Sequence, residues 1–220
     1  MASRALIGFL LLASSFGAGP GAALAAECVA LDDFSRGRLG EFPLEWKPRK
    51  ESGRPVYSIR EEGGRRFLRA IARRIGIQAG REVTWNLETY PVLAWSWRPI
   101  EFPTGSDERK SGANDSPVSV YAVFPASAVS VKSVKYVWSR VVPAGTRLTS
   151  SGGNTQVRVL RSSPQAGTWA DEQVNVREDY QKYFGGGEVP KPGGIAVLTD
   201  SDDTRSSAQG DYANFRVCKP

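Results

Sequence analysis

Short stretches of alternating apolar and polar residues run along most of the chain and constrain its fold more than any other feature. Each stretch is rich in Val, Ile, Tyr, Phe and Trp, and Gly, Pro, Asn, Asp or Ser separate one from the next. This spacing is typical of strands in an antiparallel sandwich, because successive strand side chains point to opposite faces of a sheet. The predicted strands are 56–60, 67–73, 83–87, 92–97, 118–124, 134–138, 157–160, 194–199 and 215–217.

Helical periodicity is scarce, so the fold class is all-β with at most one or two short helices. Residues 178–184 are the segment that we expect to be helical, ending at three successive glycines, 185–187. We see no internal repeat and no domain linker. The prediction is a single β-sandwich domain over residues 27–220.

Residues 1–26 have the three parts of a secretory signal peptide. Arg4 supplies the positive charge, 5–16 are largely apolar, and Ala23-Leu24-Ala25 offers small residues for cleavage after Ala25 or Ala26. The apolar run is shorter than the roughly 20 residues that span a bilayer, although a retained membrane anchor is the alternative. We therefore expect a soluble periplasmic or secreted protein, with no transmembrane segment after the signal is removed.

Cys28 and Cys218 are the only cysteines, and they stand at opposite ends of the expected mature chain. In an oxidising compartment such a pair is most simply a disulfide, which requires the first and last strands to lie side by side. Two free thiols are the alternative.

Histidine is absent from the sequence. Its absence excludes Ser-His-Asp and Cys-His nucleophilic sites in their usual form, and also histidine-ligated metal centres. Any catalysis must use carboxylates, Tyr, Lys, Arg or a hard metal held by oxygen.

The formal net charge is +6, and many arginines crowd residues 36–81. One interpretation is a surface for an anionic envelope component such as an acidic sugar or a lipid head group. The other, which we favour, is a solvated strand face. Nucleic acid is not an expected partner, because no recognition motif is present.

A long polar segment, 100–116, joins two predicted strands. Connections of this length in compact domains are often binding loops or lids, and a tolerated insertion is the alternative.

Several short blocks together resemble the bacterial domain of unknown function 3047, a family of exported proteins. They include WSWRP at 95–99, VYAVF at 120–124, KSVKYVWS at 132–139, GTW at 167–169 and GIAVLTDSDDT at 194–204. The resemblance carries no catalytic residues with it. A looser resemblance is to jelly-roll domains of the concanavalin-like or galactose-binding-like kind, on an opening segment 32–35 and a closing segment 211–217. It implies a sandwich of jelly-roll type.

The turn after the predicted strand 194–199 places three carboxylates, Asp200, Asp202 and Asp203, within four residues. Carboxylate oxygens are calcium ligands, and pairing of the terminal strands would bring Asp33 and Asp211 near. The candidate structural calcium ligands are therefore Asp33, Asp202 and Asp211. A glycan-binding floor, or a surface turn bonded to its own backbone, are the alternatives.

Tryptophans and paired carboxylates are the other candidate site groups. Trp95 and Trp97 share one strand face and are predicted to be buried, whereas Trp85 and Trp169 stand in polar surroundings that favour exposure. The doublets 107–108 and 171–172 are predicted to be surface charge, since neighbouring residues on a strand face opposite ways.

These features predict a non-catalytic envelope module that binds a glycan or another envelope component. A carboxylate-dependent glycan hydrolase or lyase is one alternative, and a scaffolding protein is another. No catalytic residue is assigned. The candidate ligand-binding residues are Trp169, Glu172, Arg98, Asn114, Asp200, Asp202 and Asp203.

Overall fold

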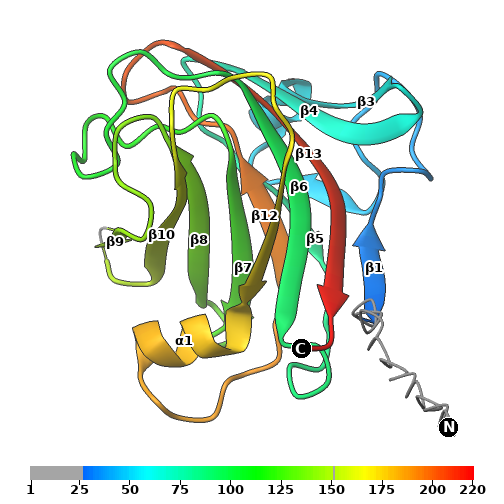
Figure 1. The fold of residues 1–220 in the computed structure, drawn as a ribbon, viewed down its shortest axis with the longest axis vertical. Helices are drawn as coiled ribbons and strands as arrows, with labels where there is room; N and C mark the ends of the chain where they lie inside the picture. Colours follow the sequence, from blue (N-terminus) through cyan, green and yellow to red (C-terminus); the bar gives the residue numbers. More distant parts are fainter. Residues whose placement is uncertain (1–26, 151) are drawn as a thin grey trace, which may run out of the picture.

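The computed structural model describes residues 27–150 and 152–220 as two β-sheets packed face to face (Figure 1). The predicted signal peptide, 1–26, lies outside the described residues. One sheet has six strands in the order β11-β6-β13-β4-β3, with β1 also paired to β13, and the other has seven in the order β2-β5-β12-β7-β8-β10-β9. The all-β prediction of a jelly-roll sandwich is confirmed.

The six-stranded sheet is built mostly from the two ends of the chain. Its strands are β1 (Cys28–Asp32), β3 (Tyr57–Glu62), β4 (Arg65–Arg73), β6 (Val92–Glu101), β11 (Ala170–Asn175) and β13 (Ser207–Cys218). The long strand β13 lies between β4 and β6 and is antiparallel to both.

The seven-stranded sheet contains β2 (Trp46–Pro48), β5 (Ala79–Glu82), β7 (Ser119–Pro125), β8 (Val131–Ser139), β9 (Arg147–Thr149), β10 (Thr155–Ser162) and β12 (Gly194–Leu198). One pair departs from the expected antiparallel arrangement, because β10 runs parallel to β8. The 140–154 connection between them includes β9, which pairs antiparallel with β10. A crossover of about a dozen residues is the length that a parallel pair requires.

The core lies between the sheets and is aromatic. On β6 the side chains of Leu93, Trp95 and Trp97 all point inward and are fully buried, as the period of two predicted. The Trp95 ring lies 5.5 Å from that of Tyr136 on β8, so the two sheets meet through these rings.

The predicted strand 83–87 is wrong: β5 ends at Glu82, and the following segment is not in a strand. Trp85 and Leu87 nevertheless pack into the core, with 8% and 6% of their surface exposed. Alternate side chains of this segment are thus buried outside any strand, so alternation alone does not establish a strand here. The expected exposure of Trp85 is wrong for the same reason.

Five strands have no counterpart in the sequence prediction: β1, β2, β5, β9 and β11. β2 and β9 have three residues each, and β11 reads ADEQVN, which lacks the expected enrichment in branched and aromatic residues. β2, β9 and β11 are edge strands, where polar side chains are tolerated on both faces.

The predicted disulfide is confirmed. Cys28 and Cys218 are bonded and are register partners on β1 and β13, so the bridge joins the first described strand to the last.

The predicted short helix is also confirmed, as α1 (Val176–Phe184). The side chain of Asn175 caps its first turn by accepting from the amide of Glu178. Gly185, at a φ of 96°, ends the helix in a conformation that favours glycine. Within the described residues, no helix has the length and apolar character needed to cross a bilayer.

Candidate functional site

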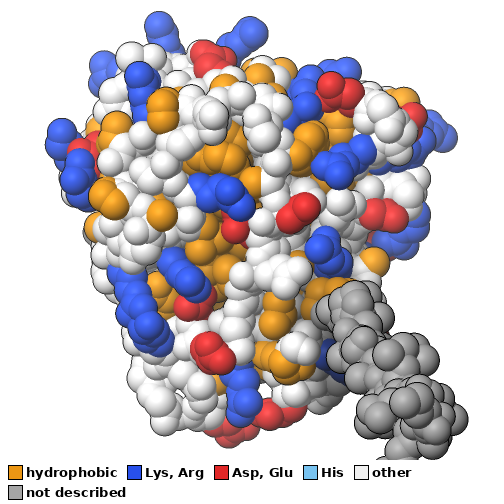
Figure 2. Space-filling model, in the orientation of Figure 1, with side chains coloured by type: hydrophobic (Ala, Val, Ile, Leu, Met, Phe, Trp, Pro, Cys, Tyr) orange, Lys and Arg blue, Asp and Glu red, His pale blue; other side chains and the backbone are white. Residues whose placement is uncertain are grey.

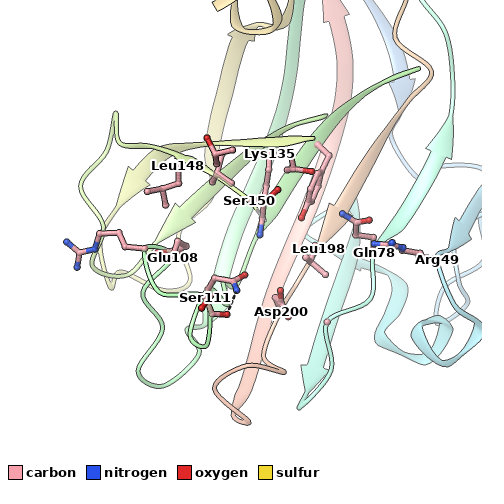
Figure 3. A pocket seen from close by; sticks show the side chains of 16 residues that line it. Arg49, Gln78, Glu108, Ser111, Lys135, Leu148, Ser150, Leu198 and Asp200 are labelled. Atoms are coloured by element: carbon pink, nitrogen blue, oxygen red, sulfur yellow. Dashed lines mark hydrogen bonds between the residues drawn. The ribbon is translucent and has the colours of Figure 1, made fainter. Parts of the chain in front are cut away.

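A cavity of about 500 Å³ lies on the outer face of the seven-stranded sheet (Figure 3). Strands β7, β8, β10 and β12 form its floor, and the 102–118 and 140–154 connections supply walls. Its volume is within the range of small-ligand sites, roughly 300–1,000 Å³. The polar groups that line it include Arg49, Gln78, Glu108, Asn114, Tyr121, Lys135 and Asp200.

Tyr121 and Lys135 form the centre of the floor. They are register partners on β7 and β8, and their neighbours Val120, Ala122 and Val134 point into the core. The alternation of the two strands therefore turns Tyr121 and Lys135 toward the cavity. The Lys135 ammonium lies 5.7 Å from the centre of the Tyr121 ring.

Lys135 is only 7% exposed, yet it keeps its charge. Burial disfavours the ammonium form, but the Tyr121 hydroxyl and the carboxylates of Asp200 and Glu108 outweigh burial, so the pKa of Lys135 is raised. The cavity floor thus presents a cation held among acceptors.

The 102–118 connection, most of the long polar segment, is folded against the sandwich. The Asp107 amide donates to the Ala113 carbonyl at 2.7 Å, and the Asp107 carboxylate accepts two hydrogen bonds from the Arg109 guanidinium. Arg109 is the main cause of an Asp107 pKa far below its usual range. Through these contacts the connection becomes a fixed wall of the cavity.

Glu108 turns from this wall into the cavity, which corrects the expectation that it is surface charge. Ser139 donates to its Oε2 at 2.5 Å, while its Oε1 is buried without a hydrogen-bond partner. Burial raises the pKa of Glu108. The residues 107 and 108 are in a turn and not in a strand, so the argument from opposite strand faces does not apply to them.

The acidic turn 200–204 closes one end of the cavity. Asp115, on the 102–118 connection, accepts from the amide and the hydroxyl of Thr204 at 2.8 and 2.5 Å. Oxygens of Asp115, Asp200 and Asp202 lie within 4.8 Å of one another. Burial, followed by the charges of Asp115 and Asp202, raises the pKa of Asp200 to about 7 in spite of Lys135.

Four of the predicted ligand-binding residues meet here. Asn114 lines the cavity and donates to the Asp203 carboxylate at 2.6 Å, and Asp200 and Asp202 belong to the same turn. The connection 102–118 and the acidic turn lie at the same end of the sandwich, opposite α1 (Figure 1).

The predicted calcium set is not brought together. Asp33 accepts from the amide of Ser35 in a local turn, and Asp211 is fully buried between Arg69 and Arg98. Among the described residues, the three carboxylates close enough to hold a metal are Asp115, Asp200 and Asp202. Of the predicted set, this group contains only Asp202.

Arg98 and Trp169 lie on the outer face of the other sheet. The Arg98 guanidinium donates to Asp211 at 2.7 Å and lies 4.8 Å from the centre of the Trp169 ring. Trp169, which is half-buried, also packs on Phe67 at 5.6 Å.

Glu172 faces the sandwich interior at the edge strand β11, where it accepts from the Trp97 indole and pairs with Arg161. Arg98, Trp169 and Glu172 are therefore separate from the cavity.

Six of the eleven arginines in the basic stretch 36–81 are paired with carboxylates. Figure 2 shows acidic side chains interspersed with basic ones over the face that it draws. Carboxylates lie within 4.0 Å of Arg36, Arg38, Arg54, Arg66, Arg69 and Arg81. This pairing fits the solvated-face interpretation better than a dedicated anion surface.

The family model for a protein of unknown function, DUF3047, matches residues 45–216. The chain belongs to this family. The match includes every group named in the cavity. Among curated proteins, none matches the sequence.

Solved structures resemble this DUF3047 chain only loosely. A complex of TmCBM61 with beta-1,4-galactotriose is 8% identical, covering 86% of this chain and 99% of that one, with a TM-score of 0.42. TmCBM27, described for specific mannan recognition, is 16% identical over 89% and 99%, with a TM-score of 0.40. Endoglucanase 3 of Trichoderma harzianum, from family GH12, is 8% identical over 90% and 99%, with a TM-score of 0.39.

Sequence reasoning missed Glu108, Tyr121, Lys135 and Asp115 of this DUF3047 site. Tyr121 and Lys135 carry a signal that could have found two of them. Each stands at an outward position of a strand whose neighbours are apolar, and the two strands are consecutive, so hairpin pairing would set them side by side. Glu108 and Asp115 carry no such signal, because a loop has no fixed period.

Proposed function

We propose that the protein is a non-catalytic module that binds a glycan in the cavity on the outer face of the seven-stranded sheet. The observation that carries the proposal is the Oε1 atom of Glu108, an acceptor buried at the cavity wall without a partner, close to the Lys135 ammonium. A buried acceptor left unpaired costs about 1–3 kcal/mol, which a ligand donor would recover.

Sugar hydroxyls supply the matching chemistry, since each hydroxyl both donates and accepts. One hydroxyl would donate to Glu108, and a neighbour would accept from Lys135. The Tyr121 ring, 5% exposed, offers a limited apolar contact beside them. Gln78 and Asn114 add amide groups at the rim.

We further propose that binding takes place outside the cytoplasm. The bonded pair Cys28 and Cys218 supports this location, because structural disulfides persist in oxidising compartments. Fractionation of cells that express the full chain, followed by a gel under non-reducing conditions, tests it. A reduced protein in the cytoplasmic fraction would contradict the location.

The test of the binding proposal is a glycan array followed by calorimetric titration of each hit. We expect one sugar class to bind the wild type, and Glu108→Gln to weaken it by about tenfold, the loss of one good hydrogen bond to a charged group. Glu188→Gln, in an exposed loop away from the cavity, is the matched control and should bind as the wild type does. An array without hits at millimolar sugar would refute the proposal.

The same samples decide the hydrolytic alternative. Glu108 and Asp200 are two carboxyl groups in one cavity whose pKa values are both raised, which is a property of acid–base catalysts. New reducing ends or unsaturated products that disappear in Glu108→Gln would replace the binding module by an enzyme. Binding without turnover is the outcome that the proposal expects.

A further inference from the structure

The acidic turn at the end of the cavity contains an oxygen-lined space that none of the glycan contacts uses. Asp115, Asp200 and Asp202 each place a carboxylate oxygen within 4.8 Å of the other two. Asp115 comes from the 102–118 connection and the other two come from the turn after β12, so the space joins two segments far apart in the sequence.

Asp200 points into this space with an atom that lacks a partner. Asp200 is only 7% exposed, and its Oδ1 atom is buried without a hydrogen-bond partner. A buried carboxylate oxygen without a donor is costly unless a cation occupies its free side.

Gly76 lets the Asp200 carboxylate approach the backbone closely. A methyl group built on its Cα would lie 2.0 Å from Asp200 Oδ1 and 3.1 Å from Asp202 Oδ1. Both oxygens therefore lie close to Gly76, and any side chain at position 76 would displace the Asp200 carboxylate. Glycine is not needed for the backbone here, because Gly76 is absent from the residues with positive φ.

We propose that Asp115, Asp200 and Asp202 bind one calcium ion in the space beside Gly76. Calcium takes oxygens at about 2.3–2.6 Å, so two of its ligands lie up to about 5 Å apart, which fits the spacing of the three carboxylates. Water and backbone carbonyls would complete a shell of six to eight oxygens. Magnesium usually keeps several waters and binds through one or two carboxylates, so a set of three carboxylates favours calcium.

The charges nearby agree with a divalent ion. Three carboxylates face the space, and the ammonium of Lys135 offsets one of them through its interaction with Asp200. The carboxylates still outnumber the ammonium group, so the surroundings of the space favour a cation. Asp203, the third carboxylate of the turn, is exposed and accepts from Asn114 instead.

Bound calcium would tie the cavity wall to the sheet. Asp115 already bonds to Thr204, so the ion would add a second link between the 102–118 connection and the turn. The site would therefore fix the position of Asn114, which immediately precedes Asp115.

The experiment is calorimetric titration of the chelator-treated full chain with calcium chloride, in the absence of any sugar. We expect one equivalent of calcium to bind. Gly76→Ala, which displaces the Asp200 carboxylate without changing a charge, and Asp202→Asn, which removes one ligand charge, should each weaken binding at least about tenfold. The matched controls are Gly112→Ala, where a methyl group meets no atom within 4 Å, and Glu188→Gln, in an exposed loop away from the turn.

Controls that bind as the wild type does, together with weak binding to magnesium, support the site. Absence of binding at millimolar calcium, equal binding by Gly76→Ala, or equal affinity for magnesium would each overturn it. Circular dichroism of each variant establishes that the sandwich is folded. Because no sugar is present, failure here is distinct from failure of the glycan proposal.

Discussion

The outer faces of the two sheets carry similar types of residue, but the charged groups are paired on one face and partly unpartnered on the other. On the six-stranded sheet, Asp211 is enclosed by Arg69 and Arg98, and Trp169 packs on Arg98 and Phe67. On the seven-stranded sheet, Glu108 and Asp200 each keep one buried oxygen without a partner.

The comparison teaches that residue type alone does not mark a site. The sequence prediction selected Trp169 for its polar surroundings and Arg98 for its place at the start of the long polar segment. In the structure these groups form ion pairs and ring contacts with one another, and such a network stabilises the sheet without a ligand. Groups left unsatisfied in a cavity are the ones that point to a ligand.

The largest expected effect concerns the strands that carry the six-stranded face. Replacing Cys28 and Cys218 together by Ser should lower the free energy of unfolding by about 4 kcal/mol, because the bridge closes nearly the whole described chain. Amide hydrogen exchange should become faster in β1 and at the end of β13, and remain slow in β7 and β8. Equally faster exchange in β7 and β8 would show that the disulfide stabilises both sheets to the same extent.

Asp211→Ala should lower the free energy of unfolding by about 3 kcal/mol, measured by urea denaturation, since it leaves two arginines without their buried partner. Glu62→Ala removes only the exposed partner of Arg98, so its effect on the free energy of unfolding should be much smaller than that of Asp211→Ala, because solvent screens an exposed ion pair. Glycan affinity of folded Asp211→Ala should equal that of the wild type. A loss of affinity would bring the six-stranded face into the binding site.

Glu108→Gln should keep its stability and lose glycan affinity, which is the opposite of the result expected for Asp211→Ala. We expect the free energy of unfolding at pH 7 to be unchanged or higher, because burial, which raises the pKa of Glu108, disfavours its charged form. Glycan affinity should fall by about tenfold in the same variant. A variant that loses stability and keeps its affinity would assign Glu108 to the structural network.

The smallest expected effect is that of Trp169→Leu. It removes contacts with Phe67, Arg65 and Arg98 at a half-buried position, and should lower the free energy of unfolding by about 1 kcal/mol. Sugar titration of the variant should give the wild-type affinity. Weaker binding would restore Trp169 as a ligand contact and sharpen the boundary of the site.

The sequence by itself determined the strands that carry branched and aromatic side chains on alternate positions. It also determined the terminal disulfide, the short helix before three glycines and membership in a family. These features are local, or follow from the chemistry of two unique cysteines, so the pattern along the chain is sufficient to reveal them. The sequence did not reveal polar edge strands such as β11, because pairing with a neighbouring strand, and not their composition, holds them in the sheet.

Only the tertiary structure decided which polar groups meet. Asp115 joins Asp200 and Asp202 because the 102–118 connection folds back on the turn after β12, and Glu108 enters the cavity because Arg109 holds its neighbour Asp107. Conversely, Asp211 was predicted to bind calcium, but its carboxylate is paired with Arg69 and Arg98. Contacts between loops have no period along the chain, so the acidic turn was visible in the sequence while its partners were not.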